Sequence, residues 1–535
     1  MTKNQGILLI ALLCVNCAFS EVFTALADLE ELLQTENFLI STMKSYIASQ
    51  EQKLSTLRKY FKEYTEQYDK ASEDIQSYVA NPVNAYLLVK KLTTDWKQVE
   101  DLITKNVGED VVTNLSHYKD VMTFPSDEDL SGAALALMRL QDTYRLDTAS
   151  LANGEIQGVK YTSQLNAEAC FELGRQSYNV GDYYHTKLWM TEADERLKRE
   201  VNHTIDRSDI LEYLAFSTFK LGNTLLALDL TNKLLELVPS HPRAIGNKVY
   251  YEDEIAKTEG LKRKGEDEVP QAPLEDYNED KSAKEFYEAL CRGDMTVPHS
   301  VSSQLKCRYA NNGNPFLRIA PFKIEEAYTK PRIWIFHDVM SDSEISTIKQ
   351  LAQPRFRRAT VQNSKTGKLE IAHYRISKSA WLKEGEHRHV DDVVQRVEDM
   401  TGLTMKTAEE LQVVNYGIGG HYEPHFDFAR KEEKNAFKDL GTGNRIATVL
   451  FYMSDVPQGG ATVFPYLKVA LWPKKGTAAF WYNLHSSGEG DRSTRHAACP
   501  VLAGSKWVSN KWIHEHGQEF RRPCGLTRPP SDLTA

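Results

Sequence analysis

Two imidazoles and one carboxylate in the C-terminal quarter of the chain could hold a metal ion. His425 and Asp427 form a His-x-Asp pair, and His496 supplies a second imidazole farther on. At strand spacing, alternate side chains point to the same face, so the imidazole and the carboxylate of the pair would project together. Two histidines and one carboxylate are the facial triad of non-haem Fe(II) oxygenases, which leaves metal positions open for a co-substrate and O2. Because a lone His-x-Asp pair also arises by chance on surfaces, the metal site can be inferred only together with the sequence around it.

Length and composition favour an ordinary soluble protein of several domains. A chain of 535 residues predicts about three or four domains. Its 41% hydrophobic and 26% charged residues are typical of globular proteins. With 65 Lys and Arg against 74 Asp and Glu, the net charge is −9, so no basic surface points to nucleic acid or to an anionic membrane.

The first twenty residues have the pattern of a secretory signal peptide. Lys3 precedes an apolar run, Ile7–Val15, and Ala18-Phe19-Ser20 places small residues at −3 and −1, which predicts cleavage after Ser20. The alternative, a membrane anchor, is disfavoured because the run is far shorter than the ~20 residues of a span. No later stretch could cross a membrane, so we expect a luminal or secreted protein. Two sequons, at Asn114 and Asn202, fit that route.

Five cysteines remain after the expected cleavage. Cys291, Cys307, Cys499 and Cys524 could form two disulfides in three connectivities in an oxidising compartment. We favour the two local pairs, Cys291–Cys307 and Cys499–Cys524. Cys170 lies in a helical pattern and is expected to be buried and free.

Residues 21–80 carry a heptad repeat. One apolar seam consists of Leu26, Leu33, Ile40, Ile47, Leu54, Phe61 and Tyr68. A second seam contains Leu29, Met43, Leu57 and Tyr64, with the polar Glu36 and Gln50 between them. Period-seven apolar positions indicate a coiled coil and hence self-association, and the alternative is a helical hairpin within one chain. Asn81-Pro82 should end the helix, and shorter helices should follow.

Residues 165–250 have the pattern of helical repeats. Two helix-and-turn units resemble tetratricopeptide repeats, and their turn glycines, Gly181 and Gly222, are 41 residues apart. Because this offset exceeds the usual ~34 residues, we expect one helix to be extended. Stacked helix pairs leave a concave face, and tyrosines gather in this segment: Tyr178, Tyr183, Tyr184, Tyr213, Tyr250 and Tyr251. An aromatic groove suits polyproline II ligands, although the tyrosines could instead pack the helices.

The last part of the chain is predicted to be rich in strands. Residues 254–283 are charged, with two prolines and few apolar groups, and are typical of a linker. Short strands are then expected at 332–336, 445–452, 462–464, 469–472, 477–482 and 506–508. Many short strands with glycine turns predict a sandwich or barrel, and a double-stranded β-helix (jelly roll) could hold a metal inside.

Several stretches resemble one known family. NYGIGGHYEPHFDFAR, GGATVFP, TRHAACPVL, GSKWVSNKWIHE and YRISKSAWL are similar to the catalytic domain of the animal collagen prolyl 4-hydroxylase alpha subunits, and CFELG…DYYHTKLWM is similar to their helical domain. The resemblance covers nearly the whole mature chain. It implies a multidomain fold of helical and β parts: a helical coiled-coil dimerisation domain at 21–145, a TPR-like peptide-binding domain at 150–255, a linker at 256–283 and a jelly-roll dioxygenase domain at 284–535.

The resemblance also assigns roles to residues of the catalytic part. The family's iron ligands fall on His425, Asp427 and His496, and its 2-oxoglutarate-binding lysine falls on Lys506, with Tyr416 as a further 2-oxoglutarate contact. His514 matches another histidine near the family's site. Because a straight strand would place Lys506 and His514 about 26 Å apart, both can serve one site only if the chain turns between them, which we expect at Ser509-Asn510. Arg445 and Trp512 are weaker candidates for substrate contact.

In the helical part, the family's peptide-binding positions match Tyr178, Tyr213, Arg243, Asn247 and Tyr250. Phe216 replaces a tyrosine often found there, so the ligand preference could differ. The resemblance further implies protein disulfide isomerase as partner in an α2β2 tetramer, and ascorbate as the reductant of iron. The chain ends in SDLTA without a retention tetrapeptide, so residence in the endoplasmic reticulum would depend on that partner.

The leading hypothesis is therefore a luminal Fe(II)/2-oxoglutarate dioxygenase that hydroxylates proline in X-Pro-Gly sequences of procollagen. Carbon 4 of proline has no acidic or electrophilic atom, so a metal, 2-oxoglutarate and O2 are needed, and succinate and CO2 are formed. One alternative is a non-catalytic scaffold for proline-rich peptides. Another is a zinc hydrolase in the same barrel, which would not need a lysine for 2-oxoglutarate.

Overall fold

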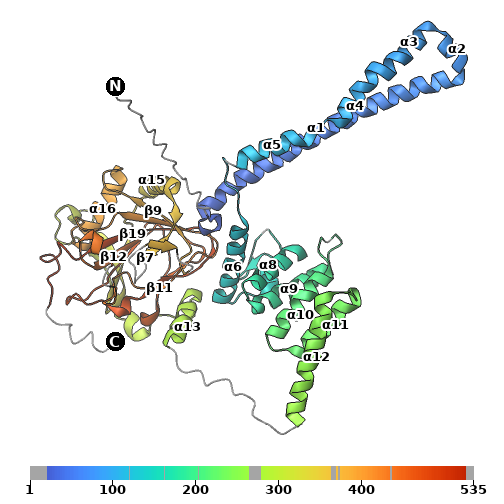
Figure 1. The fold of residues 1–535 in the computed structure, drawn as a ribbon. Helices are drawn as coiled ribbons and strands as arrows, with labels where there is room; N and C mark the ends of the chain where they lie inside the picture. Colours follow the sequence, from blue (N-terminus) through green and yellow to red (C-terminus); the bar gives the residue numbers. More distant parts are fainter. Residues whose placement is uncertain are drawn as a thin grey trace, which may run out of the picture. The chain divides into compact units, whose positions relative to one another are not determined.

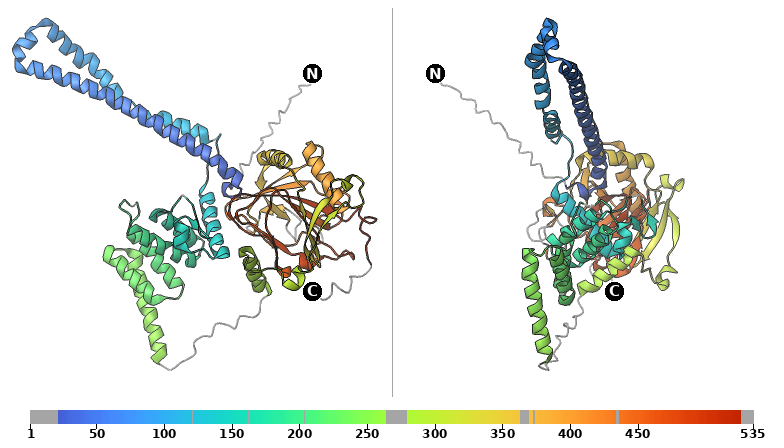
Figure 2. Two further views of the ribbon diagram at one scale, coloured as in Figure 1. Left: turned by 180° about the vertical axis from the view of Figure 1, so that it is seen from behind. Right: turned by 90° about the vertical axis from the view of Figure 1, so that its right-hand side faces the viewer.

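A computed structural model describes residues 21–119, 121–161, 163–202, 204–263, 279–362, 369–371, 374–433 and 436–525. The expected signal peptide, residues 1–20, and the side chain of Asn114 lie outside the described residues, whereas Asn202 is exposed. The chain forms two compact units, one of Asp28–Pro125 and one that joins the residues before Asp28 to those after Pro125. Figure 1 shows both, and Figure 2 shows them from two other sides. In the described part of the chain, no helix is both long and apolar enough to cross a membrane.

The first unit is an arm of antiparallel helices. Its elements are α1 (Leu26–Glu73), α2 (Ile75–Ala80), α3 (Pro82–Lys90), a π-helical turn (Lys91–Asp95), α4 (Trp96–Thr104) and α5 (Val107–Lys119). The long helix ends at Glu73, before the predicted end at Asn81-Pro82, which instead separates α2 from α3. Asn81 caps α3, and its side chain accepts a hydrogen bond from the Val83 amide. Lys53 on α1 donates to the carbonyls of Ile103 and Lys105, at 3.0 and 2.7 Å. The arm is therefore the hairpin within one chain that the heptad left open as an alternative (Figure 1).

The hairpin leaves the predicted coiled-coil seam of α1 uncovered. Between 49 and 74% of the surface is exposed at Leu33, Ile40, Ile47, Leu54, Phe61 and Tyr68. The contacts with the shorter helices involve Lys53, which lies outside both seams, and Tyr64 of the second seam, whose ring lies 6.1 Å from that of Trp96. The hairpin therefore covers part of the second predicted seam and leaves the first seam exposed.

The helical part of the second unit contains the two predicted repeat units. Its elements are α6 (Asp127–Tyr144), α7 (Thr148–Ala152), β1 (Glu155–Ile156), β2 (Val159–Lys160), α8 (Ala167–Asn179), α9 (Tyr183–Leu197), α10 (Arg207–Lys220), α11 (Thr224–Leu237) and α12 (Pro242–Arg263). Gly181 and Gly222 turn the chain with φ of 80° and 86°, a conformation that glycine adopts without strain. The prediction of an extended helix is wrong, because α9 and α10 have only 15 and 14 residues and the extra length lies in their connection.

The rest of the second unit is an antiparallel double sheet, and the predicted strands are all present. The helices are α13 (Glu279–Arg292), α14 (His299–Ser302), α15 (Asp342–Ala352) and α16 (Arg388–Thr401). The strands are β3 (Cys307–Ala310), β4 (Phe322–Thr329), β5 (Arg332–His337), β6 (Arg357–Arg358), β7 (Thr360–Gln362), β8 (Leu369–Ile371), β9 (Lys378–Leu382), β10 (Leu411–Tyr416), β11 (Tyr422–His425), β12 (Arg445–Tyr452), β13 (Gln458–Gly459), β14 (Thr462–Phe464), β15 (Val469–Leu471), β16 (Ala478–Tyr482), β17 (His496–Ala498), β18 (Val501–Ala503) and β19 (Lys506–His514).

Two of these sheets face each other across an apolar layer. The large sheet has the order β3-β4-β5-β16-β12-β19-β10-β9-β6, and the small one β11-β17-β14-β15. Between them pack side chains of both sheets, including Leu450, Phe464 and Val508. The opposite face of the large sheet is covered by α15 and α16, through residues such as Ile348 and Val397. The chemistry-bearing strands β10, β11, β17 and β19 therefore line the space between the sheets.

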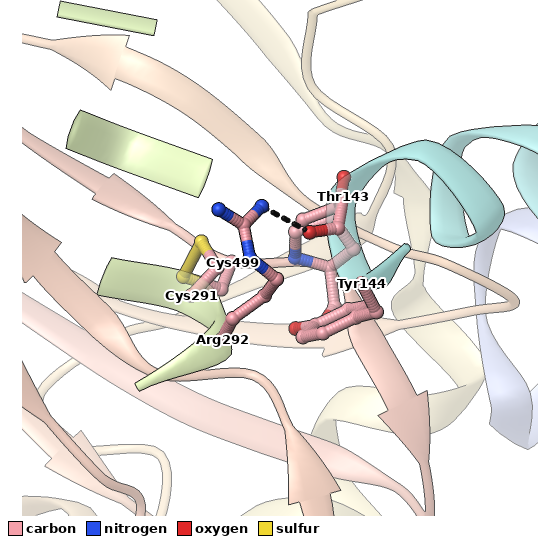
Figure 3. Close-up of a disulfide and its surroundings, with 6 residues drawn as sticks. Thr143, Tyr144, Cys291, Arg292 and Cys499 are labelled. Atoms are coloured by element: carbon pink, nitrogen blue, oxygen red, sulfur yellow. Dashed lines mark hydrogen bonds between the residues drawn. A yellow bond between two sulfur atoms is a disulfide. The ribbon is translucent and has the colours of Figure 1, made fainter. Parts of the chain in front are cut away.

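The observed disulfide joins Cys291 to Cys499, so the prediction of two local pairs is wrong (Figure 3). Helix α13 packs on β14 and β15, and this brings Cys291 at its end to within 5.5 Å (Cα–Cα) of Cys499, which follows β17. Cys307 begins β3 at the edge of the large sheet, and Cys307 and Cys524 are both free and exposed. Cys170 is buried and free, as predicted.

Candidate metal centre and co-substrate pocket

The pairing of two short strands brings the three predicted metal ligands together. His425 ends β11 and His496 begins β17, and the two are directly opposite each other in the antiparallel register. Asp427 follows just beyond β11, so it enters the site from the bend after the strand. Its carboxylate oxygens lie 3.9 Å from Nε2 of His425 and 3.6 Å from Nε2 of His496. One donor atom from each residue lies within 4.8 Å of the other two, and among the described residues no other His, Cys, Asp or Glu group has this geometry.

Hydrogen bonds turn both imidazoles so that Nε2 points at the carboxylate. Nδ1 of His425 lies 2.7 Å from the Glu423 carbonyl, and Nδ1 of His496 lies 3.0 Å from the Thr494 carbonyl. Because a carbonyl can only accept, each Nδ1 carries the proton, and each Nε2 keeps a lone pair for a metal. Burial and the neighbouring His496 lower the pKa of His425 to about 3, so its ring is neutral at physiological pH.

The carboxylate is held ionised by its surroundings. Burial on its own would raise the pKa of Asp427, but His496, His425 and Arg445 lower it to about 2, together with a hydrogen bond from Thr448. Thr448 Oγ1 donates to Asp427 Oδ2 at 2.7 Å and in turn accepts from Asn483 Nδ2 at 2.9 Å. Two neutral imidazoles and one carboxylate are the donor set of non-haem Fe(II), so these residues fit the implied metal.

Lys506 contributes a buried cation to the cavity that the three ligands line. Tyr416 on β10 pairs directly with Lys506 on β19, and the Nζ atom lies 5.0 Å from the Tyr416 ring. Only 1% of Lys506 is exposed, and burial lowers its pKa to about 7. No described acidic side chain contributes to that pKa, so nothing described in the cavity compensates the charge of Lys506 when it is protonated, and a bound anion would favour that form. A small dicarboxylate that reaches both the metal and Lys506 fits this arrangement.

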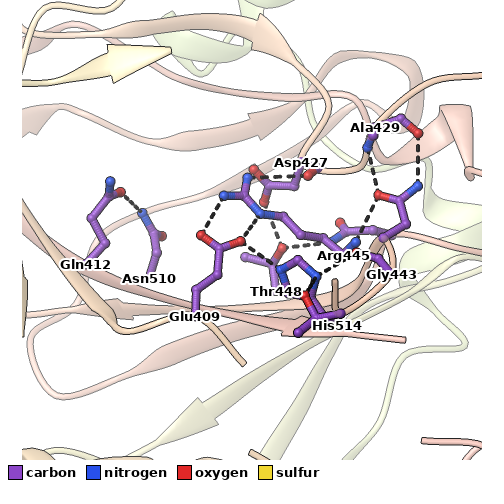
Figure 4. Close-up of polar contacts among 12 residues, drawn as sticks. Glu409, Gln412, Asp427, Ala429, Gly443, Arg445, Thr448, Asn510 and His514 are labelled. Carbon is purple, nitrogen blue, oxygen red and sulfur yellow. Dashed lines mark hydrogen bonds and ion pairs between the residues drawn. The ribbon is translucent and has the colours of Figure 1, made fainter. Parts of the chain in front are cut away.

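The structure does not bring His514 to this cavity. Strand β19 runs without interruption from Lys506 to His514, so the predicted turn at Ser509-Asn510 is wrong. The His514 ring is fully buried farther along the strand, with Nε2 2.9 Å from Glu409 and Nδ1 2.7 Å from the Gly443 carbonyl (Figure 4). In this position the His514 ring contacts and orients the Glu409 carboxylate.

Arg445 and Trp512 lie between His514 and the metal ligands. The Arg445 guanidinium forms an ion pair with Glu409 and lies 3.9 Å from the centre of the Trp512 ring. It also donates to the backbone carbonyl of Asp427 at 3.4 Å (Figure 4). Trp512 lines both the inner cavity and a large outer groove that opens onto it. Both side chains therefore stand where a substrate in the groove would approach the metal.

The structure adds functional residues that sequence reasoning missed. The Tyr422 ring stacks on the His425 ring, with 3.5 Å between the two centroids. The Arg375 guanidinium lies 4.8 Å from the centroid of the same Tyr422 ring. Tyr422 and Arg375 stand inside the motifs that carry the family resemblance, so their position was a usable signal. Glu409 lies outside those motifs, and nothing in the sequence marked it.

The helical part gathers most of the predicted peptide-binding residues. Tyr178 on α8 and Tyr213 on α10 meet edge to face at 4.9 Å, and Phe216 packs on Tyr178 at 5.8 Å. Arg243 forms a 2.6 Å ion pair with Glu212 and acts electrostatically on Tyr178. The remaining two predictions, Asn247 and Tyr250, lie on α12, where the Tyr250 ring contacts Phe219 at 5.5 Å. Tyr178, Tyr213 and Arg243 thus form one group, and Tyr250 belongs to a neighbouring aromatic cluster.

Sheet, ligand set and buried lysine define an Fe(II)/2-oxoglutarate-dependent dioxygenase, and residues 411–514 match the model of the 2OG-Fe(II) oxygenase superfamily. The rest of the chain is more specific. Residues 25–158 match the N-terminal region of the prolyl 4-hydroxylase alpha subunit, and residues 167–257 match the prolyl 4-hydroxylase peptide-substrate-binding domain. The chain belongs to the prolyl 4-hydroxylase alpha subunit family.

Individual relatives agree over almost the full length. The chain is 49% identical to prolyl 4-hydroxylase subunit alpha-1 of Homo sapiens, over 96% of this chain and 98% of the relative. It is 50% identical to subunit alpha-2 of Caenorhabditis elegans, over 98% and 96%. A solved structure of a viral collagen prolyl hydroxylase from Paramecium bursaria Chlorella virus-1, in a 2OG complex, covers 34% of this chain and 94% of its own, at 24% identity and a TM-score of 0.27.

Proposed function

We propose that the protein is the catalytic alpha subunit of a procollagen-proline 4-hydroxylase, acting on proline in X-Pro-Gly sequences. The observation that carries the proposal is the single cavity lined by His425, Asp427, His496 and the uncompensated cation of Lys506. A peptide-binding domain with an aromatic group in the same chain supports a proline-rich polypeptide as the substrate.

The residues of the chain divide the work by position. His425, Asp427 and His496 would hold Fe(II), Lys506 would bind the distal carboxylate of 2-oxoglutarate, and Tyr416 would line the same pocket. Bound iron and 2-oxoglutarate supply the oxidising chemistry that replaces a hydrogen on carbon 4 by a hydroxyl group, using O2. Most of the side chains that line the pocket are buried, which strengthens the attraction between Lys506 and a carboxylate.

The outer groove is where the peptide would lie. Arg445 is fixed by Glu409, which His514 supports from behind, and the Trp512 ring lies against the guanidinium. Burial alone would raise the pKa of Glu409, but Arg445 and His514 lower it to about 2, so the network stays ionised. We assign Arg445 and Trp512 to placing the proline ring, and His514 to holding the network rather than to contact with the reacting atoms.

Location and assembly are also part of the proposal. The buried Cys291–Cys499 disulfide supports an oxidising compartment, and with the predicted signal peptide it favours the lumen of the endoplasmic reticulum. The uncovered heptad seam of α1 supports pairing with a second alpha subunit. Protein disulfide isomerase is the partner that the family resemblance implies, in an α2β2 tetramer, and ascorbate would keep the iron reduced.

Anaerobic Fe(II) binding followed by peptide-dependent succinate release tests the function. The full assembly, given (Pro-Pro-Gly)10, 2-oxoglutarate and O2, should form succinate and 4-hydroxyproline in equal amounts. Asp427→Ala should bind no iron and form neither product, whereas His299→Ala, a change at an exposed histidine, should behave as wild type.

Two results would favour the alternatives. Tight peptide binding without any succinate in the iron-loaded protein would favour a scaffold. Activity with zinc in the absence of 2-oxoglutarate would favour a hydrolase, and in either case the assignment of Lys506 would fall with the proposal.

A further inference from the structure

Residues Glu21–Ala27, which include the first two residues of α1, are built into the catalytic unit, and we call them the N-terminal strap. The strap touches β10, 388 residues away in sequence. Its buried members, each at most 7% exposed, are Val22, Phe23, Thr24, Ala25 and Ala27. Burial of so short a segment requires partners on both sides, and the structure contains them.

One side of the strap is held by helix α6. The carboxylate of Asp129 accepts hydrogen bonds from the backbone amides of Val22 and Phe23, the second at 3.3 Å. The Phe23 ring lies so close to the helix that a Cβ atom on Gly132 would be 2.2 Å from it. No side chain larger than that of glycine fits at this position of α6 while the ring is docked.

The other side is held by the turn between β10 and β11. The Ile418 amide donates to the Phe23 carbonyl at 3.1 Å, and a Cβ atom on Gly417 would lie 1.9 Å from that carbonyl. Glu21 adds a 3.0 Å ion pair with Arg358, whose side chain is 10% exposed. Gly132 and Gly417, on separate elements, both leave room for Phe23. The strap is therefore closely packed into this unit.

One side chain connects the strap to the co-substrate pocket. Asn415 is completely buried; its Oδ1 accepts from the Ala27 amide at 3.1 Å, and its Nδ2 donates to the Lys506 carbonyl at 3.3 Å. The next residue, Tyr416, is the direct cross-strand partner of Lys506. The amide of Asn415 therefore fixes the backbone of the lysine that faces the cavity, and the strap fixes the amide.

We propose that the N-terminal strap is a positioning element of the 2-oxoglutarate pocket and that Asn415 is the positioning residue that transmits its effect. The proposal rests on the function assigned to Lys506 above. A docked strap holds Asn415, Asn415 holds the start of β19, and Lys506 is then aimed at the cavity. Loss of the strap leaves the metal ligands in place and weakens the binding of 2-oxoglutarate.

Steady-state kinetics of three variants of the full assembly test this. Phe23→Ala removes the ring that docks the strap. Asn415→Asp keeps an acceptor for Ala27 and loses the donor to the Lys506 carbonyl, so it separates the two contacts. Both should raise the KM for 2-oxoglutarate by about three- to tenfold, the worth of about one hydrogen bond, and leave the KM for (Pro-Pro-Gly)10 within about twofold. Phe520→Ala, at a fully exposed ring, is the matched control and should change neither constant.

Hydrogen exchange supplies a readout that does not depend on turnover. In Phe23→Ala the Ile418 amide should lose its protection, whereas in Asn415→Asp it should keep it, because the strap stays docked. A Phe23→Ala protein with an unchanged KM for 2-oxoglutarate, or with equal losses in both KM values and in kcat, would overturn the proposal. If Phe23→Ala does not fold, Asn415→Asp and Glu21→Gln decide by the same measurements.

Lys506→Ala distinguishes a failure of this inference from a failure of the proposed function. A Lys506→Ala protein with a raised KM for 2-oxoglutarate, beside strap variants with a normal one, refutes only the positioning role. An unchanged KM in Lys506→Ala refutes the pocket itself, and with it the role of the strap.

Discussion

Replacing Lys506 by Met should stabilise the cofactor-free protein while it damages the enzyme. Burial lowers the pKa of this lysine from 10.5 to about 7, because no described acidic group compensates its charge. At about 1.4 kcal/mol for each tenfold change in the protonation equilibrium, this lowered pKa sets an upper limit of about 5 kcal/mol on the gain from removing the charge. Methionine keeps most of the volume of the lysine stem and carries no charge to desolvate.

The sign of the pH dependence follows from the direction of the shift. Between pH 7 and 10.5 the unfolded chain holds a proton that the folded protein has lost, so wild-type stability rises with pH in this window. Below pH 7 both states hold the proton, and the destabilisation by Lys506 is fully present. The advantage of Lys506→Met should therefore be largest below pH 7, at up to about 4–5 kcal/mol, and fall to about 1–1.5 kcal/mol at pH 9.5.

Urea unfolding at pH 6.5 and 9.5, followed by tryptophan fluorescence without iron or 2-oxoglutarate, measures the stability. In the assay, the KM for 2-oxoglutarate should rise about 10- to 150-fold, since a charge-assisted contact is worth ~1.5–3 kcal/mol. Lys511→Met is the matched control: Lys511 is equally buried on the same strand but lies 3.2 Å from Glu384, and it faces away from the cavity. A less stable Lys506→Met protein at pH 6.5, a stability difference that does not vary with pH, or a normal KM would refute the reasoning.

Three further predictions concern the metal centre, the helical domain and the disulfide. Thr448→Val removes the hydrogen bond to the carboxylate ligand and should lower Fe(II) affinity about 10- to 100-fold, measured by anaerobic titration; unchanged affinity would count against the ligand assignment. Tyr178→Ala should weaken (Pro-Pro-Gly)10 binding about fivefold by calorimetry, while Tyr184→Ala, at a largely exposed ring, should not, and equal effects would indicate a packing role. Peptide mapping without reductant should link Cys291 to Cys499, and any other pairing would contradict the structure.

The sequence was sufficient to predict that these three side chains lie together, because their residue types stand in recognisable motifs. His425 and Asp427 are two residues apart, and the family resemblance added His496, whereas the pairing of β11 with β17 came only from the structure. The same holds for Lys506, which stands in a motif that also carries a strand. Residue type, short spacing and one strand pairing are enough to form such a site.

Features that depend on distant packing could not be predicted in this way. Cys291 and Cys307 are close in sequence, but α13 packs on the small sheet and carries Cys291 away from β3. The strap was taken for the first turn of the coiled coil, because Leu26 continues the heptad, and only its contacts with α6 and β10 reveal a different partner. The long strand β19 was divided at Ser509-Asn510 so that Lys506 and His514 could serve one site, although Ser509 and Asn510 are both paired inside the sheet.

The disulfide and a ferrous centre make opposite redox demands on the surroundings of this protein. A ferrous centre needs reductant in its surroundings, whereas a disulfide is lost if reductant reaches it. Cys291 and Cys499 are 1% and 0% exposed, so the sulfurs are shielded from thiols in the folded state, while His425 and Asp427 line the outer groove. The bond spans 208 residues and its closure of that loop is worth about 5 kcal/mol in the chain-entropy model. Inactivation by thiols should therefore proceed at the rate at which the catalytic unit opens, and become independent of thiol concentration once that rate is limiting.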